Sequence, residues 1–173
     1  MKLFKDFLLE DDFKICYDDL LKKLSSESWN YTKMTWTSLD VTRGITGSVL
    51  SSSVSQKVFD LLIEKFSKIL DISSFEKIGM MYYVWQPYSG LALHDDHCFQ
   101  MASTIYLNQD WHVDYGGIFL WKESKEDEIY KAIPPIKNMM ILNDQLQDHM
   151  VTPISPLAPN LRTTIQVWFN NVD

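Results

Sequence analysis

The sequence predicts a mainly β fold with N-terminal helices (α+β), in which the helices buttress a sandwich or jelly roll of short strands. Apolar residues recur at helical spacing only in the first part of the chain. After about Lys77 the pattern changes to short runs of branched and aromatic residues, and Gly, Pro, Asn and Asp separate these runs. Helices that cover a series of short strands are typical of this layered architecture.

The length and composition predict a single globular domain. A chain of 173 residues is long enough for one domain with a proper core and short for two. Hydrophobic residues make up 46% and aromatic residues 13%, which excludes a disordered or collagen-like chain. We expect one domain over residues 1–173, with a mainly helical buttress and a candidate lid at 1–76 and the jelly roll at 77–173.

The net charge and the cysteine content limit which binding partners and which cell compartment we expect for the protein. The formal net charge of −7 argues against a nucleic-acid backbone or an anionic membrane as the main partner. Cys16 and Cys98 are far apart and lack CxxC spacing, so we expect free thiols in a reducing compartment, with one bridge as the alternative. The sequence has neither a signal peptide pattern nor a run of roughly 20 apolar residues. It therefore predicts a soluble, cytoplasmic protein.

Two amphipathic helices are expected in the first part of the chain. One runs from about Asp12 to Leu24, and a second with a stronger apolar stripe runs from Val54 to Leu70, with Ser51 to Ser53 as N-caps. The Ser/Thr/Gly-rich segment 28–53 lies between them and carries several aromatic residues, among them Trp29 and Trp36. It is either a hairpin or surface loop that covers the core, or a lid at the mouth of a site.

Strands are expected in the second part, where β-branched and aromatic residues are enriched. The predicted strands are Ile78–Gln86, Ser103–Asn108, Gly117–Trp121, Asn138–Leu142 and Thr163–Phe169. The charged segment Lys122–Lys131 is expected to be a solvated excursion, and Gly116–Gly117 is expected to form a turn.

The candidate site is centred on the triplet His94–Asp95–Asp96. In an extended strand alternate side chains share a face, so His94 and Asp96 point one way, while Asp95 and His97 point the other. One imidazole and one carboxylate can hold one edge of a divalent metal ion, and His149 is the candidate third ligand. Two histidines and one carboxylate on one face are typical of non-haem Fe(II) oxygenases. The alternative is an ordinary solvated loop.

The last strand allows two interpretations. One face carries Arg162, Thr164, Gln166 and Trp168, and the other face is mainly apolar. In an ordinary sandwich the polar face is exposed to water. Alternatively it lines a cavity, where Arg162 offers a planar fork to a carboxylate and Thr164 a further donor. Because a buried arginine without an anion is costly, this second interpretation requires an acidic ligand. Tyr106 offers the same choice between core packing and donation to that anion.

Taken in order, these motifs resemble the Fe(II)/2-oxoglutarate dioxygenases, and most closely their prolyl-4-hydroxylase-like branch. The resemblance covers about residues 83 to 169. It is carried by His94–Asp96 (HxD), Tyr106–Trp111 (YLNxxW), Gly116–Gly117, Pro135–Asn138 (PxxN), His149–Pro153 (HxVxP) and Arg162–Trp168 (RxTIxVW).

The resemblance implies a double-stranded β-helix, a cupin-like jelly roll, in which His94, Asp96 and His149 hold Fe(II). Such an enzyme uses 2-oxoglutarate and O2, with ascorbate as a stimulant, and hydroxylates an unactivated C–H bond while releasing succinate and CO2. A carboxylate at Asp96 occupies the position that halogenating relatives leave open for chloride, which favours hydroxylation. The branch implies an amino-acid-type substrate, prolyl or another side chain, in a peptide or as a free molecule.

The resemblance also implies a cosubstrate pocket. The distal carboxylate of 2-oxoglutarate would pair with Arg162, helped by Tyr106 and Thr164, and Trp168 would lie in the wall beside the metal. The tyrosine element that normally precedes the HxD motif aligns poorly, so that Tyr88 or Trp85 stands in its place.

Two other classes of function stay open at this point. A zinc hydrolase or another cupin-type enzyme could use the same metal ligands without 2-oxoglutarate, and its activity would then be indifferent to Arg162. A non-catalytic module would bind 2-oxoglutarate without forming succinate. His97 and His112 match no ligand position and are expected at the surface.

Overall fold

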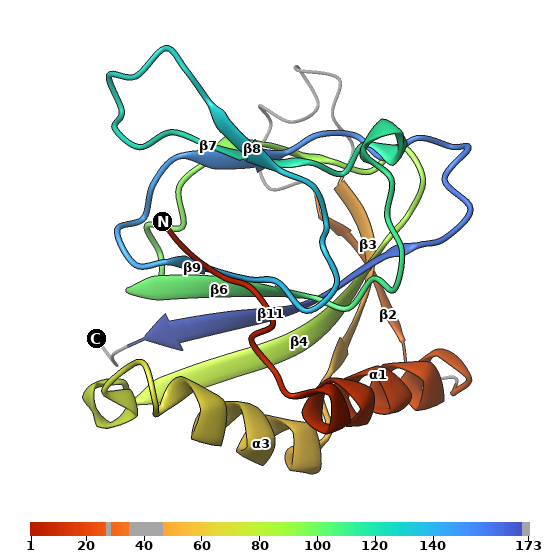
Figure 1. Ribbon diagram of the computed structural model, residues 1–173, viewed down its shortest axis with the longest axis vertical. Helices are drawn as coiled ribbons and strands as arrows, with labels where there is room; N and C mark the ends of the chain where they lie inside the picture. Colours follow the sequence, from red (N-terminus) through yellow and green to blue (C-terminus); the bar gives the residue numbers. More distant parts are fainter. Residues whose placement is uncertain (27–28, 35–46, 171–173) are drawn as a thin grey trace.

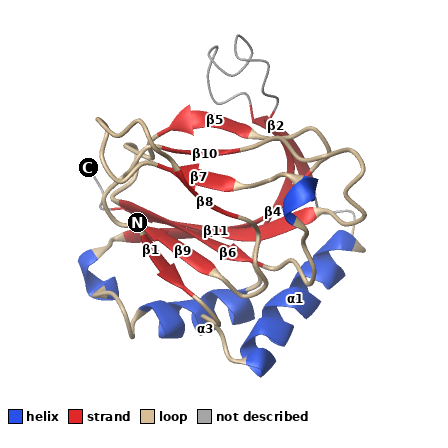
Figure 2. Cartoon of the chain, turned by 45° about the horizontal axis from the view of Figure 1, so that its top comes forward, coloured by secondary structure: helices blue, strands red, loops and turns tan. Residues whose placement is uncertain are grey.

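Two antiparallel sheets face each other, and two helices cover the outer face of the larger sheet (Figures 1 and 2). The computed structural model describes residues 1–26, 29–34 and 47–170. The larger sheet has the strand order β1 (Lys2–Phe4), β9 (Met140–Asn143), β6 (Met101–Tyr106), β11 (Arg162–Asn170), β4 (Lys77–Trp85), β3 (Gly47–Ser53) and β2 (Asn30–Met34). The smaller sheet has the order β5 (Leu91–His94), β10 (His149–Val151), β7 (Phe119–Trp121) and β8 (Lys131–Ile133). This architecture confirms the predicted jelly roll.

The helices begin and end close to the predicted positions. Helix α1 spans Glu10–Leu24, with acidic residues in its first turn and lysines in its last, which complements the helix dipole. Helix α3 spans Gln56–Phe66 and is capped by the Ser55 side chain, which accepts from the backbone N–H of Val58. The predicted caps Ser51–Ser53 are wrong, because these residues belong to β3 and pair with β4.

The main core fills the space between the helices and the larger sheet. It includes Val58, Leu62 and Phe66 of α3, which are fully buried against the sheet. The rings of Phe66 and Phe169 meet edge to face at 5.2 Å. Trp29 also packs against this core and therefore lies on the helix side of the sheet. Burial of this size supplies the main favourable term of folding.

One buried polar contact ties α1 to the sheet. The Tyr82 hydroxyl of β4 donates to the Asp19 carboxylate at 2.8 Å and lies 3.1 Å from the carbonyl oxygen of Cys16. Asp19 also accepts from the backbone N–H of Ser55 at the start of α3. The arrangement satisfies a hydroxyl that would otherwise be costly to bury.

The two faces of β11 have different environments. Ile165, Val167 and Phe169 belong to the core against the helices, whereas Arg162 and Trp168 line the space between the sheets. Of the two interpretations of this strand, the interior cavity is therefore the one that holds, and a polar face exposed to water is wrong.

Several elements go beyond the predicted strands. The three-residue strands β1, β8 and β10 were not expected, nor was the extent to which segment 28–53 is sheet. Within that segment β2 and β3 pair as a hairpin, from Asn30 opposite Ser51 to Met34 opposite Gly47, while Trp36 lies outside the described residues. Two short 3-10 helices, η1 (Ile72–Ser74) and η2 (Val113–Tyr115), complete the described chain. No helix among the described residues is both long and apolar enough to cross a membrane.

Candidate metal centre and anion pocket

His94, Asp96 and His149 meet between the two sheets. Their ligand atoms lie within 4.8 Å of one another. His94 ends β5 and His149 begins β10, and the two residues are direct partners in this antiparallel pair, which explains how side chains far apart in sequence come together. An oxygen of Asp96 lies 3.7 Å from Nε2 of His94, and the other oxygen lies 3.4 Å from Nε2 of His149.

Backbone carbonyl groups fix both imidazole rings. Nδ1 of His94 lies 2.8 Å from the carbonyl oxygen of Ala92, and Nδ1 of His149 lies 2.8 Å from that of Gln147. Because a carbonyl oxygen only accepts, each Nδ1 carries the proton and donates it. Each Nε2 therefore presents a lone pair toward Asp96, which is the usual arrangement of a metal-binding histidine.

The environment of His149 keeps its ring neutral. Burial lowers the pKa of His149, and the neighbouring His94 acts in the same direction. The ring stacks on Phe119, with the centroids 5.2 Å apart. A neutral imidazole is the form that binds a metal, so burial prepares this residue as a ligand.

Arg162 lies at the closed end of the same cavity. It is 1% exposed, and its guanidinium lies between the rings of Trp85 and Tyr106, 4.9 and 5.2 Å from the two centroids. Its Nε donates to the carbonyl of Gly117 at 3.1 Å and its Nη2 to the Tyr106 hydroxyl at 3.5 Å. Nη1 is buried and has no hydrogen-bond partner among the residues that the structure describes. Burial lowers the pKa of Arg162, so the site as it stands penalises the charge. An anion is needed at Nη1.

Gly116 and Gly117 do more than the turn predicted for them. Both have positive φ, at 68° and 64°, and they follow η2. A Cβ atom on Gly117 would lie 2.9 Å from Cδ of Arg162, and one on Gly116 would lie 2.2 Å from the carbonyl oxygen of Pro153. The absence of a side chain therefore lets the backbone of Gly117 approach Arg162 closely, and that of Gly116 approach Pro153.

The remaining predicted residues are distributed as follows. Thr164 and Tyr106 are fully buried beside Arg162. Trp168 lines the cavity, with its ring 5.7 Å from that of Tyr83. Of the two residues considered for the poorly aligned tyrosine element, Tyr88 is 65% exposed, whereas the Trp85 ring lies 4.9 Å from the Arg162 guanidinium.

The histidines expected at the surface are there. The side chains of His97 and His112 are 82% and 62% exposed. His97 contacts Asp95, which also faces Lys125 at 3.4 Å. The proximity of His97 lowers the pKa of Asp95. None of these groups faces the cavity.

Sequence reasoning missed several residues that line the cavity, among them Tyr83 and Asn143. Tyr83 of β4 shares the inner face with Trp85, and alternation from Trp85 was the signal that could have found it. Burial and the charge of Asp96 raise the pKa of Tyr83 to about 12. Asn143 of β9 also lines the cavity, and its Nδ2 lies 3.4 Å from Nδ1 of His149. No sequence signal indicated Asn143.

Comparisons with known proteins agree with this geometry. The family described as the 2OG-Fe(II) oxygenase superfamily matches residues 80–170. A prolyl hydroxylase from Trichoplax adhaerens, solved with a peptide fragment of the hypoxia inducible factor oxygen degradation domain, is 15% identical with a TM-score of 0.76, covering 98% of this chain and 83% of that one. A prolyl-4-hydroxylase from Pseudomonas putida is 16% identical with a TM-score of 0.73, covering 98% and 92%.

A third solved structure is that of an enzyme with a different reaction. The non-haem α-ketoglutarate-dependent epimerase SnoN from nogalamycin biosynthesis is 9% identical with a TM-score of 0.67, and the match covers 98% of this chain and 77% of that one. A search of curated protein sequences gives no match. At these identities the structural likenesses show the fold alone.

Proposed function

The chain belongs to the 2OG-Fe(II) oxygenase superfamily, whose match at residues 80–170 spans more than half of its 173 residues, and we propose on this premise that it hydroxylates an amino-acid-type substrate. It is a 2-oxoglutarate-dependent dioxygenase that works with Fe(II) and O2. The substrate and the roles of individual residues are the proposed part.

We assign the metal to His94, Asp96 and His149. Two imidazoles and one carboxylate converge on one point, with both Nε2 atoms on the side of Asp96, which is the donor set that suits Fe(II) with an open opposite face. When bound with 2-oxoglutarate, the iron supplies the activation of O2 that inserts one oxygen atom into a C–H bond, while the other oxygen atom enters succinate and CO2 leaves.

We assign the distal carboxylate of 2-oxoglutarate to the pocket around Arg162. The unpartnered Nη1 supports this assignment, because a carboxylate there would neutralise the buried guanidinium through charge-assisted hydrogen bonds. Tyr106 and Thr164, both fully buried beside Arg162, supply further hydroxyl groups. These residues bind and orient the cosubstrate and exclude water from the end of the cavity.

The substrate is proposed to be a prolyl or other amino-acid side chain, in a peptide or free. Trp168 supports this, because its ring lies between those of Tyr83 and Phe99, 5.7 Å from each, and offers an aromatic wall for an apolar C–H group. The two prolyl hydroxylases named above share the fold, and one of them was solved with a peptide, which also supports this substrate class. A cytoplasmic location is likewise proposed, and the free thiols of Cys16 and Cys98 support it.

The observation that carries the proposal is the presence of three convergent ligand atoms and an unpaired guanidinium nitrogen in one cavity. A zinc hydrolase without 2-oxoglutarate offers no reason for that buried charge. The test is to add Fe(II) and then 2-oxoglutarate without oxygen and to record the visible charge-transfer band. Oxygen is then admitted, and succinate release is measured with free amino acids and proline-containing peptides.

Three variants sharpen the test. Asp96→Ala should lose the band, and Arg162→Met should need more than about 100-fold more 2-oxoglutarate to reach it. His97→Ala is the matched control, because its side chain is 82% exposed and should leave the band unchanged. A wild-type band in Asp96→Ala would remove this residue from the metal site. Binding of 2-oxoglutarate without succinate formation on any substrate would favour the non-catalytic module.

A further inference from the structure

We propose that Gln166 is a positioning residue that turns the Thr164 hydroxyl toward the cosubstrate as a hydrogen-bond donor. The proposal rests on the proposed function, because the acceptor is the distal carboxylate of 2-oxoglutarate. Gln166 lies on β11 on the same inner face as Thr164, and it is paired directly across from Thr104 of β6.

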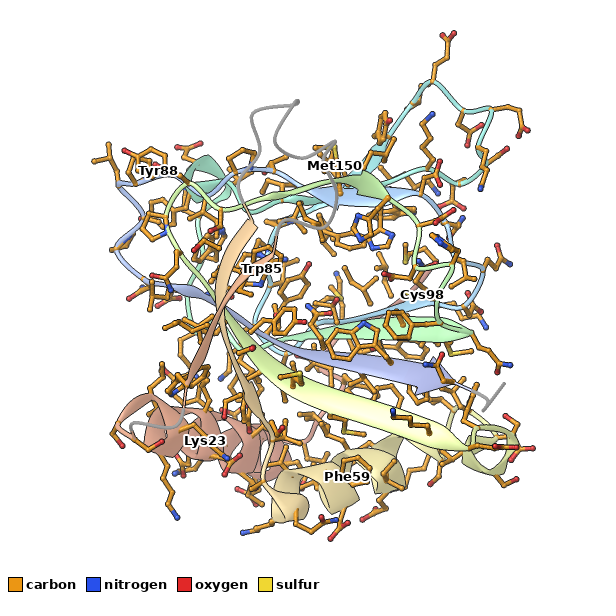
Figure 3. All side chains as sticks on the ribbon, turned by 180° about the vertical axis from the view of Figure 1, so that it is seen from behind. Lys23, Phe59, Trp85, Tyr88, Cys98 and Met150 are labelled. Carbon is orange, nitrogen blue, oxygen red and sulfur yellow. The ribbon has the colours of Figure 1, made fainter. Side chains whose placement is uncertain are left out.

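A short chain of hydrogen bonds runs through these side chains. Thr104 Oγ1 donates to Gln166 Oε1 at 2.8 Å, and Gln166 Nε2 donates to Thr164 Oγ1 at 3.1 Å. Trp85 Nε1 approaches the same Thr164 oxygen at 3.4 Å. Figure 3 shows Trp85 between the two sheets, where it can reach this strand from β4. Side chains from three strands of the larger sheet therefore form one hydrogen-bonded group around the Thr164 hydroxyl, which itself accepts from Trp85 and Gln166.

The direction of these bonds decides what Thr164 can do. An indole N–H and an amide N–H only donate, so the Thr164 oxygen accepts from Trp85 and from Gln166 and uses both lone pairs. The hydroxyl can then take part in one further hydrogen bond only as a donor, through its single proton. Within the described part of the chain this proton has no acceptor, although Thr164 is fully buried.

The same argument applies to Tyr106, the register partner of Thr164. The Tyr106 oxygen accepts from Nη2 of Arg162, which leaves its own proton available. The two N–H groups of Arg162 Nη1 and the hydroxyl protons of Tyr106 and Thr164 are therefore available on neighbouring side chains. A carboxylate has about four acceptor positions, so its capacity matches that of these donors.

Gln166 decides this arrangement because its amide has two different ends. Reversing the amide would place Oε1 against Thr164, which would then donate to Gln166 and have no proton for a ligand. Thr104 opposes the reversal, because its hydroxyl donates to Oε1 in the observed orientation. The orientation of the Gln166 amide thus determines whether the Thr164 hydroxyl can donate to a ligand.

The test is a double-mutant cycle on 2-oxoglutarate binding, measured by calorimetry with Mn(II) in place of iron. Thr164→Val should raise the Kd about 10-fold, and Gln166→Met about 3- to 10-fold. If Gln166 acts through Thr164, the double variant should bind as Thr164→Val does, because the relay is already broken. Factors that multiply in the double variant would overturn the proposal.

A charged variant and a control complete the experiment. Gln166→Glu accepts at both ends and draws the Thr164 proton away from the ligand, so its Kd should rise more than that of Gln166→Met. With the active enzyme, both Gln166 variants should raise the KM for 2-oxoglutarate and leave kcat at saturation near the wild-type value. Thr163→Val removes a hydroxyl from the residue next to Thr164 on β11, which does not line the cavity, and should leave the Kd unchanged.

The two proposals fail in distinguishable ways. If wild-type protein does not bind 2-oxoglutarate, or Arg162→Met binds it as tightly, the proposed function is wrong. If those results are as expected but Gln166→Glu binds like the wild type, only the role of Gln166 is wrong. Circular dichroism and the thermal midpoint of each variant show whether a change in Kd comes from loss of folding, and a variant that fails to fold is replaced by Gln166→Asn.

Discussion

Replacement of Gly117 by alanine should weaken both the fold and the binding of 2-oxoglutarate. Gly117 has φ of 64°, a left-handed conformation that costs an alanine about 1–2 kcal/mol. Its new Cβ would lie 2.9 Å from Cδ of Arg162 and 3.3 Å from Cγ1 of Ile154. Relieving such overpacking costs about 1–3 kcal/mol. The sum is about 2–5 kcal/mol, which for a domain of this size lowers the Tm by roughly 4–20 °C.

The effect on binding comes from the position of Arg162. Its Nε donates to the Gly117 carbonyl at 3.1 Å, and the Cβ atom of alanine would push the side chain away from that anchor. A hydrogen bond to a charged group contributes about 1.5–3 kcal/mol. Losing alignment of one such bond to the distal carboxylate should raise the Kd of 2-oxoglutarate about 10- to 100-fold. Affinity for the metal alone should stay unchanged, because Gly117 contacts none of the three metal ligands.

Gly79→Ala is the matched control. Gly79 lies in β4 and has no positive φ, and its added Cβ would meet only Cε3 of Trp168, at an ordinary 3.7 Å. This variant should be neutral or more stable by about 0.4–1 kcal/mol, since alanine restricts the unfolded chain. Urea unfolding and calorimetric titration with 2-oxoglutarate measure both quantities. A Gly117→Ala protein with the wild-type unfolding midpoint and Kd would refute the reasoning.

Three further predictions concern other parts of the molecule. In the native protein a thiol reagent should modify exposed Cys98 and not Cys16, because burial raises the pKa of Cys16 to about 12; mass spectrometry should find both modified only in denaturant. Tyr82→Phe should lower the free energy of unfolding by about 1–2 kcal/mol in urea, because the half-buried Asp19 carboxylate loses a donor; no change would show that water replaces the hydroxyl. Burial lowers the pKa of His149 from 6.5, so below that pH the unfolded chain binds a proton that the folded chain rejects. The stability of the metal-free protein should therefore fall as the pH drops through this range, and should fall less in His149→Gln; equal pH slopes would contradict the assignment.

Local patterns in the sequence were sufficient to predict the features of the structure that have a local physical cause. The period of two in the last strand correctly separated Arg162 and Trp168 from Ile165 and Phe169, because alternation is a property of the extended backbone itself. Helical spacing likewise located α1 and α3 to within a few residues of their ends. The capping residue of α3 was misassigned because a serine run permits several caps, and only the pairing of β3 with β4 excludes the earlier ones.

Contacts between residues far apart in the sequence could not be predicted from the local residue pattern. No spacing rule brings His149 opposite His94, because this pairing depends on how β5 and β10 meet in the smaller sheet. The order of motifs was needed to predict it. Gly117 was interpreted as a turn for the same reason: its contact with Arg162 joins the segment after η2 to the start of β11. A three-residue strand such as β10 is also too short to show a period.

The two ends of the cavity make opposite demands on a ligand, and one molecule can satisfy both. At one end the imidazoles of His94 and His149 and the Asp96 carboxylate favour a cation, and at the other the buried guanidinium of Arg162 requires an anion. A ligand that carries a metal-binding group and a distal carboxylate therefore fits, whereas a monocarboxylate leaves one end unpaired. Because such a ligand binds only the folded chain, it should stabilise the fold by RT ln(1 + [L]/Kd), about 2.7 kcal/mol at 100 times the Kd. Glutarate, which keeps both carboxylates but lacks the keto oxygen, should give part of this stabilisation through Arg162 alone. In Arg162→Met that part should vanish while the response to the metal persists, which separates the contributions of the two ends.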